Sequence, residues 1–183
     1  MTPNTPQMPL PPLSFYVSMA AYNQQMNQQF YDACAQLTDA ERKRDRGAFF
    51  QSIHRTLEHL LFGDLAWLSR FWEQQLINCA IGEPLYDDFN ELRHQREECD
   101  QRILDWTQTL TQDWLLTDLR YESQAYSRTR VLPRWLLVTH MFNHQTHHRG
   151  QLSTLLSQTH QNFGVTDLPW INAFAAAELP QEQ

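Results

Sequence analysis

Glycine and proline are so unevenly placed in this chain that long, uninterrupted helices are the structure it favours. Only 5 of its 183 residues are glycine, and the first five of its 9 prolines fall within residues 1–12. These two residue types interrupt helices most strongly, so most of the chain beyond residue 12 is free to form long helices. We therefore predict an all-α protein with a flexible, Pro-rich N-terminus over residues 1–12.

Apolar residues recur at helical spacing in several parts of the chain, which predicts four long helices. They cover approximately residues 13–37, 47–75, 87–110 and 133–161. Residues 115–131 lack this period, and their Tyr, Thr and Ser content favours a loop or a short hairpin. Four long helices joined by loops predict an antiparallel four-helix bundle, formed by a single domain over residues 13–178.

Two residues of the fourth predicted helix are informative. Pro133 suits its first turn, and Gly150 lies within it, which indicates close packing or space for a bulky neighbour. Beyond it, Pro169 indicates a short C-terminal helix that runs to Ala177, and residues 179–183 are expected to fray.

Charge and cysteine content exclude several classes of function. A net charge of −7 argues against nucleic-acid binding, which depends on clustered Lys and Arg. The N-terminus lacks the pattern of a secretory signal, and no stretch approaches the length of apolar sequence that a membrane helix needs. The three cysteines are scattered and form no CxxC motif, which is typical of packed thiols in a reducing compartment. We predict a cytoplasmic protein that binds neither nucleic acid nor membrane.

Half of the eight histidines lie within residues 140–148. His140, His144 and His148 follow one another at intervals of four residues, which places them on one side of a helix where imidazoles can converge on a metal ion. His147 lies about 60° from His144 around the helix and is the weaker candidate. The alternative is that these histidines are ordinary polar members of a half-exposed helix face.

Two segments of the sequence resemble the DinB family, also described as DinB/YfiT-like metalloenzymes. One is TLEHLLFGDLAWL, residues 56–68, and the other is HMFNHQTHHRGQ, residues 140–151. Weaker matches are Tyr22-Asn23, residues 46–50 and residues 166–169. The resemblance implies a four-helix bundle with up-down-down-up connections.

The resemblance also implies a divalent metal bound by His59, His144 and His148. Family members are often homodimers, and some relatives are transferases or isomerases that use small cellular thiols. Three neutral imidazoles suit a catalytic site because they leave a coordination position open for water or substrate. They suit zinc or nickel, with iron as a further possibility.

Several polar residues near these histidines are candidates to orient the ligands or to hold a bound water. They are His140, His147, Asp64, Asn143 and Gln151. For Asp64 we favour a role as partner of Arg149 or of a helix terminus over direct ligation. Trp67 and Trp72 are candidates to line the pocket.

The function we expect is a metalloenzyme, because three protein ligands leave a coordination position open. The sequence lacks an HExxH motif and a Gly-rich phosphate loop, and no ExxH pair includes His59 or a histidine of residues 140–148. We expect a site that activates water or a small thiol for a small-molecule substrate, in a transferase or a hydrolase. No cysteine lies near the histidine motifs, so the thiol would be external. The alternative is a non-catalytic metal-binding protein of the stress response.

Overall fold

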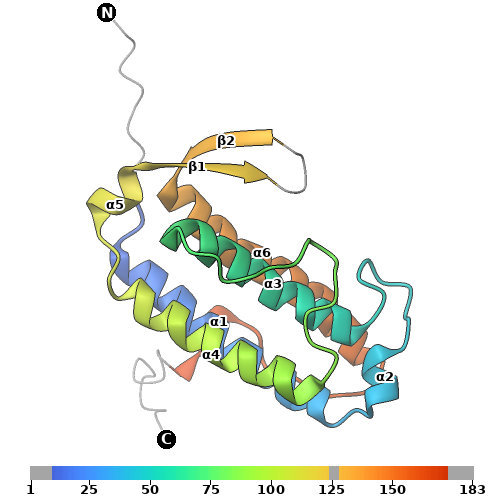
Figure 1. Ribbon diagram of the computed structural model, residues 1–183. Coiled ribbons are helices and arrows are strands. Elements are labelled where there is room, and N and C mark those ends of the chain that lie inside the picture. Colours follow the sequence, from blue (N-terminus) through green and yellow to red (C-terminus); the bar gives the residue numbers. More distant parts are fainter. Residues whose placement is uncertain (1–9, 124–127, 173–183) are drawn as a thin grey trace, which may run out of the picture.

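The computed structural model, which describes residues 10–123 and 128–172, is mostly helical with one small two-stranded sheet (Figure 1). Its four long helices are α1 (Leu13–Ala35), α3 (Ile53–Trp72), α4 (Phe89–Thr107) and α6 (Arg134–Ser157). Its shorter elements are α2 (Asp39–Lys43), α5 (Gln112–Leu116), the strands β1 (Asp118–Ser123) and β2 (Arg128–Pro133), and the 3-10 helix η1 (Leu168–Trp170).

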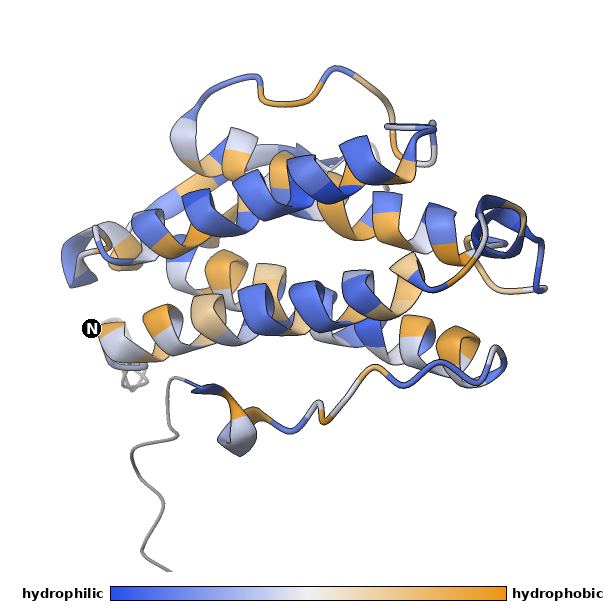
Figure 2. Cartoon of the chain, turned by 90° about the horizontal axis from the view of Figure 1, so that it is seen from below, coloured by the Kyte–Doolittle hydropathy of each residue, from blue (hydrophilic) through white to orange (hydrophobic). Residues whose placement is uncertain are grey.

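The long helices pack as two neighbouring pairs. α1 lies against α4 and α3 lies against α6, while further contacts join α1 to α6 and α3 to α4. Hydrophilic and hydrophobic residues alternate along these helices, as expected when one side of each helix is buried (Figure 2). The apolar stripe predicted for the second helix is confirmed from Ile53 to Phe71, whose apolar members are all buried. Within the described residues, no helix combines the length and apolar composition that crossing a bilayer requires.

The second predicted helix begins later than expected, at Ile53 instead of near Gly47. Gly47 and Gln51 both have positive φ angles, 68° and 66°, which no continuous right-handed helix can contain. The hydroxyl of Ser52 then caps the helix by accepting a hydrogen bond from the Arg55 N–H at 3.2 Å. Residues 47–52 therefore form a compact turn that leads into α3.

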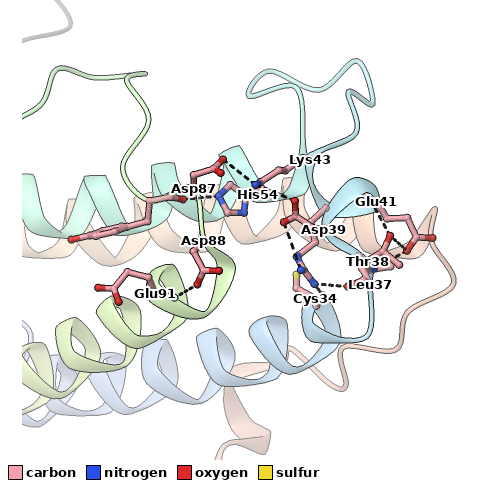
Figure 3. A network of polar contacts seen from close by, with 12 residues as sticks. Cys34, Leu37, Thr38, Asp39, Glu41, Lys43, His54, Asp87, Asp88 and Glu91 are labelled. Carbon is pink, nitrogen blue, oxygen red and sulfur yellow. Dashed lines mark hydrogen bonds and ion pairs between the residues drawn. The ribbon is translucent and has the colours of Figure 1, made fainter.

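A short helix, α2, follows the first long helix where a loop was expected. Thr38 and Glu41 form a reciprocal capping box at its start. Lys43 at its other end forms ion pairs with Asp39 at 3.1 Å and with Asp87 at 2.9 Å, in the segment that precedes α4 (Figure 3). These contacts fasten α2 to the entrance of α4.

Of the loop or short hairpin expected over residues 115–131, the structure has the hairpin, displaced by two to three residues towards the C-terminus. Its strands pair antiparallel from Asp118 opposite Pro133 to Ser123 opposite Arg128. The third predicted helix ends at Thr107, and a separate short helix, α5, connects it to the hairpin. The fourth begins at Arg134, directly after Pro133.

The segment after α6 runs back along α1. The Tyr22 hydroxyl donates to the Thr166 carbonyl at 2.7 Å, and the rings of Phe30 and Phe163 stack with centroids 5.0 Å apart. The helix predicted from Pro169 is a single 3-10 turn, Leu168–Trp170, and its predicted extension to Ala177 lies outside the described residues from residue 173 onwards.

Candidate metal centre

The packing of α3 against α6 brings together three histidines that are distant in sequence. His59 lies on α3, and His144 and His148 lie one turn apart on α6. The Nε2 atom of His59 is 3.2 Å from Nε2 of His144 and 3.2 Å from Nε2 of His148. All three ligand atoms lie within 4.8 Å of one another, so this cluster could hold a metal ion.

A glycine on α3 makes the close approach of His144 possible. A Cβ atom built on Gly63 would lie 2.7 Å from Cε1 and 3.0 Å from Nδ1 of the His144 ring, which is too close for any side chain. Gly63 is four residues after His59 and therefore on the same side of α3. Of the two explanations offered for Gly150, close packing is wrong, because a Cβ atom there would meet nothing within 4 Å.

The ring of Phe50 covers one side of the cluster. It stacks on His59 with centroids 3.9 Å apart and an interplanar angle of 23°, and its edge approaches His148 at 5.3 Å. Phe50 lies in the turn that precedes α3, where the backbone reverses at Gln51. The turn thus places an aromatic ring over two of the three imidazoles.

Burial keeps the three imidazoles neutral near pH 7. It lowers the pKa of His59 to about 4, with a smaller contribution from the neighbouring His148. Burial, followed by the charges of His148 and His59, lowers the pKa of His144 to about 3. Burial also lowers the pKa of His148. Neutral imidazole is the form that binds metal ions.

Gln151 fixes which nitrogen of His148 faces the cluster. The Gln151 side-chain oxygen, which can only accept, lies 2.8 Å from Nδ1 of His148, so Nδ1 carries the hydrogen and donates it. The neutral ring then has a free lone pair on Nε2, which points towards His59. Of the candidates to orient a ligand, Gln151 is the one that this contact favours.

The donor set fits one tetrahedral ion better than it fits a hydrogen-bonded cluster. Nitrogen ligands about 2.0–2.1 Å from a tetrahedral zinc are roughly 3.3 Å apart, close to the two separations of 3.2 Å. His59 Nε2 carries at most one hydrogen or one lone pair, so an ordinary hydrogen bond accounts for only one of its two contacts.

The other residues considered from the sequence are not among the three that converge, although the ring centroid of His147 lies 4.7 Å from that of His148 and the ring centroid of His140 lies 6.1 Å from that of His144. His147 and Asn143 are exposed. His140 is also exposed, and its ring meets the edge of the Trp67 ring, with centroids 5.2 Å apart. Asp64 is fully buried and pairs with Arg96 of α4 at 2.8 Å. The expectation that its partner would be Arg149 or a helix terminus is therefore wrong, and Asp64 is not part of the histidine cluster.

Asp64 belongs to a buried polar network that the sequence did not indicate. Arg96 lies between the carboxylates of Asp64 and Asp100, at 2.8 Å from each, and all three side chains are at most 4 % exposed. Burial raises the pKa of Asp64 to about 6, although the charge of Arg96 acts in the opposite direction. Burial also raises the pKa of Asp100.

Two further helices join the same network. Asn27 of α1 donates to Asp100 at 2.9 Å, and Asn23 of α1 donates to the same carboxylate at 3.3 Å. Arg149 of α6, directly after His148, donates to the side-chain oxygen of Asn23. The network therefore ties α1, α3, α4 and α6 together next to the histidine cluster.

The histidine cluster borders a pocket of about 640 Å³. His59 and His144 form part of its wall, together with residues from α3, α6 and the hairpin, whereas His148 is not part of the lining. Trp67 lines the pocket as expected, and Trp72 does not. Three arginines of the lining were missed from the sequence, namely Arg70, Arg128 and Arg130.

Comparison with known proteins gives the same family that the two motifs suggested. The family model described as "DinB family" matches residues 8–182, which is nearly the whole chain. The chain belongs to the DinB family. This DinB-family chain is 24% identical over 159 residues to "Protein DinB" of Bacillus subtilis (strain 168), a match covering 84% of the chain and 91% of that protein.

A second relative and a solved structure also resemble this chain. The "Uncharacterized protein YizA" of Bacillus subtilis (strain 168) is 26% identical over 135 residues, covering 72% of the chain and 80% of that protein. The crystal structure of a DinB-like protein from Bacillus cereus ATCC 10987 has a TM-score of 0.59 at 19% identity, covering 79% of this chain and 90% of that one. This structural similarity shows that the two proteins share the fold.

Proposed function

We propose that this protein is a metalloenzyme in which His59, His144 and His148 hold one divalent metal ion. The observation that carries the proposal is the position of the cluster: three neutral imidazoles converge at the wall of a pocket large enough for a small molecule. Three protein ligands with an open side are typical of catalytic sites, whereas structural zinc sites are closed by four. Zinc or nickel suits these donors best, with iron as the further candidate.

The surrounding residues define what a bound ion could do. A divalent ion at this site would supply Lewis-acid activation of a water or a thiol. Gln151 holds the ligating tautomer of His148, and Phe50 shields His59 on the side that it covers. His59 and His144 border the pocket, so a substrate would approach from their side.

A thiol used in the reaction would come from outside the chain. Cys34 and Cys99 are buried, and burial raises the pKa of each thiol to about 12. Cys79 belongs neither to the histidine cluster nor to the pocket lining, and burial raises its pKa as well. The activity we propose is that of a transferase using a small cellular thiol, or of a hydrolase using water.

Cobalt substitution with glutathione as the probe tests this proposal. A sulfur ligand on cobalt produces a charge-transfer band in the near ultraviolet, so glutathione should add this band to the spectrum of the cobalt-loaded protein. The matched control is His144→Ala, in which no such band should develop. If glutathione leaves the spectrum unchanged while small oxyanions perturb it, the proposal of a transferase is wrong and that of a hydrolase is favoured. A spectrum that neither ligand changes would favour the non-catalytic metal-binding protein.

The finer architecture and the location are part of the same proposal. α1 contacts both α4 and α6, and α3 contacts the same two helices, which supports the up-down-down-up four-helix bundle of the family. Three free cysteines support a location in the reducing cytoplasm.

A further inference from the structure

The pocket beside the histidine cluster carries an unusual charge for this protein. The chain as a whole has a net charge of −7, yet the described residues that line the pocket include three arginines and no carboxylate. The arginines are Arg70 of α3 and Arg128 and Arg130 of β2. Arginine stays protonated, so this lining is strongly positive.

The register of the hairpin explains why two of these arginines reach the pocket. Tyr121 lies opposite Arg130, and Ser123 lies opposite Arg128. Alternate residues of a strand point to the same side of a sheet, so these four side chains share one face. All four line the pocket. One face of the hairpin therefore contributes two cross-strand pairs to the pocket wall, and each pair contains one arginine.

The third arginine, Arg70, comes from α3. Arg70 donates to the Ala66 carbonyl at 3.1 Å, and its guanidinium lies 4.8 Å from the centre of the Trp67 ring and 5.6 Å from that of Tyr121. Stacking of this kind restricts a guanidinium and leaves its N–H groups available for a ligand.

The three guanidinium groups are not neutralised by the protein around them. Among residues 10–123 and 128–172, no carboxylate lies within the 4.0 Å of an ion pair with Arg70, Arg128 or Arg130. Elsewhere in the described residues, Arg42, Arg55, Arg93 and Arg96 do have such a partner. Unpaired guanidinium groups that converge on one pocket are typical of sites for carboxylate or phosphate.

We propose that this pocket binds a small organic oxyanion, whose carboxylate or phosphate group is held by Arg70, Arg128 and Arg130. The apolar part of the ligand lies against Phe62, Trp67 and Ile81, which line the same cavity. This inference deepens the proposed function and rests on it in one respect: it places the reacting part of the ligand towards His59 and His144.

The test uses metal-free protein, so that its outcome does not depend on the metal. Benzoate and phenylphosphonate serve as probes in isothermal titration calorimetry, with benzamide as the neutral isostere of benzoate. We expect at least one anion to bind and benzamide to bind at least about tenfold more weakly, because hydrogen bonds to charged groups are the strong ones. Added salt should weaken the binding of the anion. The anion that binds more tightly identifies carboxylate or phosphate as the natural group.

Variants of the hairpin locate the site. Arg128→Gln and Arg130→Gln together should weaken binding of the anion about tenfold or more, and Arg70→Gln should weaken it as well. The matched control is Arg120→Gln, which removes the same charge from the opposite face of the hairpin, because Arg120 pairs with Val131. Circular dichroism confirms that each variant is folded.

Two results would overturn the inference: neither anion binds at millimolar concentration, or Arg120→Gln weakens binding as much as the double variant does. Failure of the proposed function would look different, since the protein would then bind no metal, or its cobalt spectrum would respond neither to glutathione nor to small oxyanions. The titration of metal-free protein would still report on the arginines in that case.

Discussion

At the scale of single residues, the absence of a side chain on Gly63 determines the geometry of the cluster as much as the histidines do. A methyl group there would enter the His144 ring, with Cβ 2.7 Å from Cε1. We predict that Gly63→Ala weakens metal binding about tenfold or more, because displaced ligands lose affinity. Alanine should at the same time favour the helix by about 1 kcal/mol.

Competition titration of the metal against a chelator measures this effect, and Gly150→Ala is the matched control. It adds the same methyl group to a helix where nothing lies within 4 Å. A Gly63→Ala protein with the metal affinity of the wild type would show that His144 does not need this space.

Gln151 gives a second prediction at this scale. Its side-chain oxygen accepts the hydrogen of His148 Nδ1 at 2.8 Å. Partners of this kind are worth roughly 10–100-fold in metal affinity, so Gln151→Ala should weaken metal binding by about that factor. Gln151→Glu, which keeps an acceptor, should retain most of the affinity. Equal affinity of the alanine variant and the wild type would contradict the role of Gln151.

The sequence predicts these single residues only in part. Helical spacing left His140 as an alternative to His148, and the resemblance to the family singled out the three residues that the structure brings together. Gln151 was one of five polar candidates, and spacing alone could not select it. The roles of Gly63 and Phe50 depend on their contacts with His144 and His59. Such contacts belong to the tertiary structure, which local sequence signals do not show. The signal for Gly63 was its place four residues after His59.

At the scale of elements, the buried Asp64–Arg96–Asp100 group links α3 to α4, and it makes stability depend on pH. Burial raises the pKa of Asp64 from 3.8 in its ordinary state to about 6 in the fold. The folded protein therefore binds more protons than the unfolded chain between these values. The contribution of Asp64 to stability is fully present below pH 3.8 and is lost as the pH rises through about 6.

The prediction is a pH-dependent difference between the wild type and Asp64→Asn, whose side chain cannot ionise. As the pH rises from 3.8 to about 6, the free energy of unfolding of the wild type should fall relative to that of the variant. Urea unfolding at a series of pH values measures the difference. A constant difference across this interval, or one that changes in the opposite direction, would contradict the raised pKa.

The elements themselves were predictable where local signals decide. Apolar periodicity located the four long helices, and Pro12 and Pro133 stand directly before two of them. Local signals failed where backbone conformation outside the right-handed helix intervened, as at Gly47 and Gln51. They also failed for the buried network, because polar residues on an amphipathic helix are expected to be solvated unless their partners are known.

At the scale of the whole molecule, the family resemblance predicts a homodimer, which would form between identical faces of two chains. Large apolar side chains exposed in the structure are available for such a face, and Phe49 and Trp170 are the most exposed, at 84% and 65%. Light scattering at micromolar concentration should give twice the 21.7 kDa mass of the chain. A mass of 21.7 kDa would contradict the homodimer.

The pocket shows what the whole molecule adds to the sequence. Arg128 and Arg130 are two residues apart in a short strand. This spacing indicates a shared binding face only once the register of the hairpin and its position against α3 and α6 are known. Three pieces of chain far apart in sequence meet there, whereas the histidine motifs are each local. Motifs therefore located the candidate metal centre, and packing was needed to define the cavity beside it.

The measurement that tests the central claim most directly is elemental analysis of purified protein and of four single variants. We predict about one divalent metal ion per chain in the wild type, and none in His59→Ala, His144→Ala or His148→Ala, since two imidazoles alone do not complete the site. His147→Ala, which removes an exposed neighbouring histidine, should keep the metal content of the wild type. An unchanged metal content in folded His144→Ala would contradict the three-histidine site.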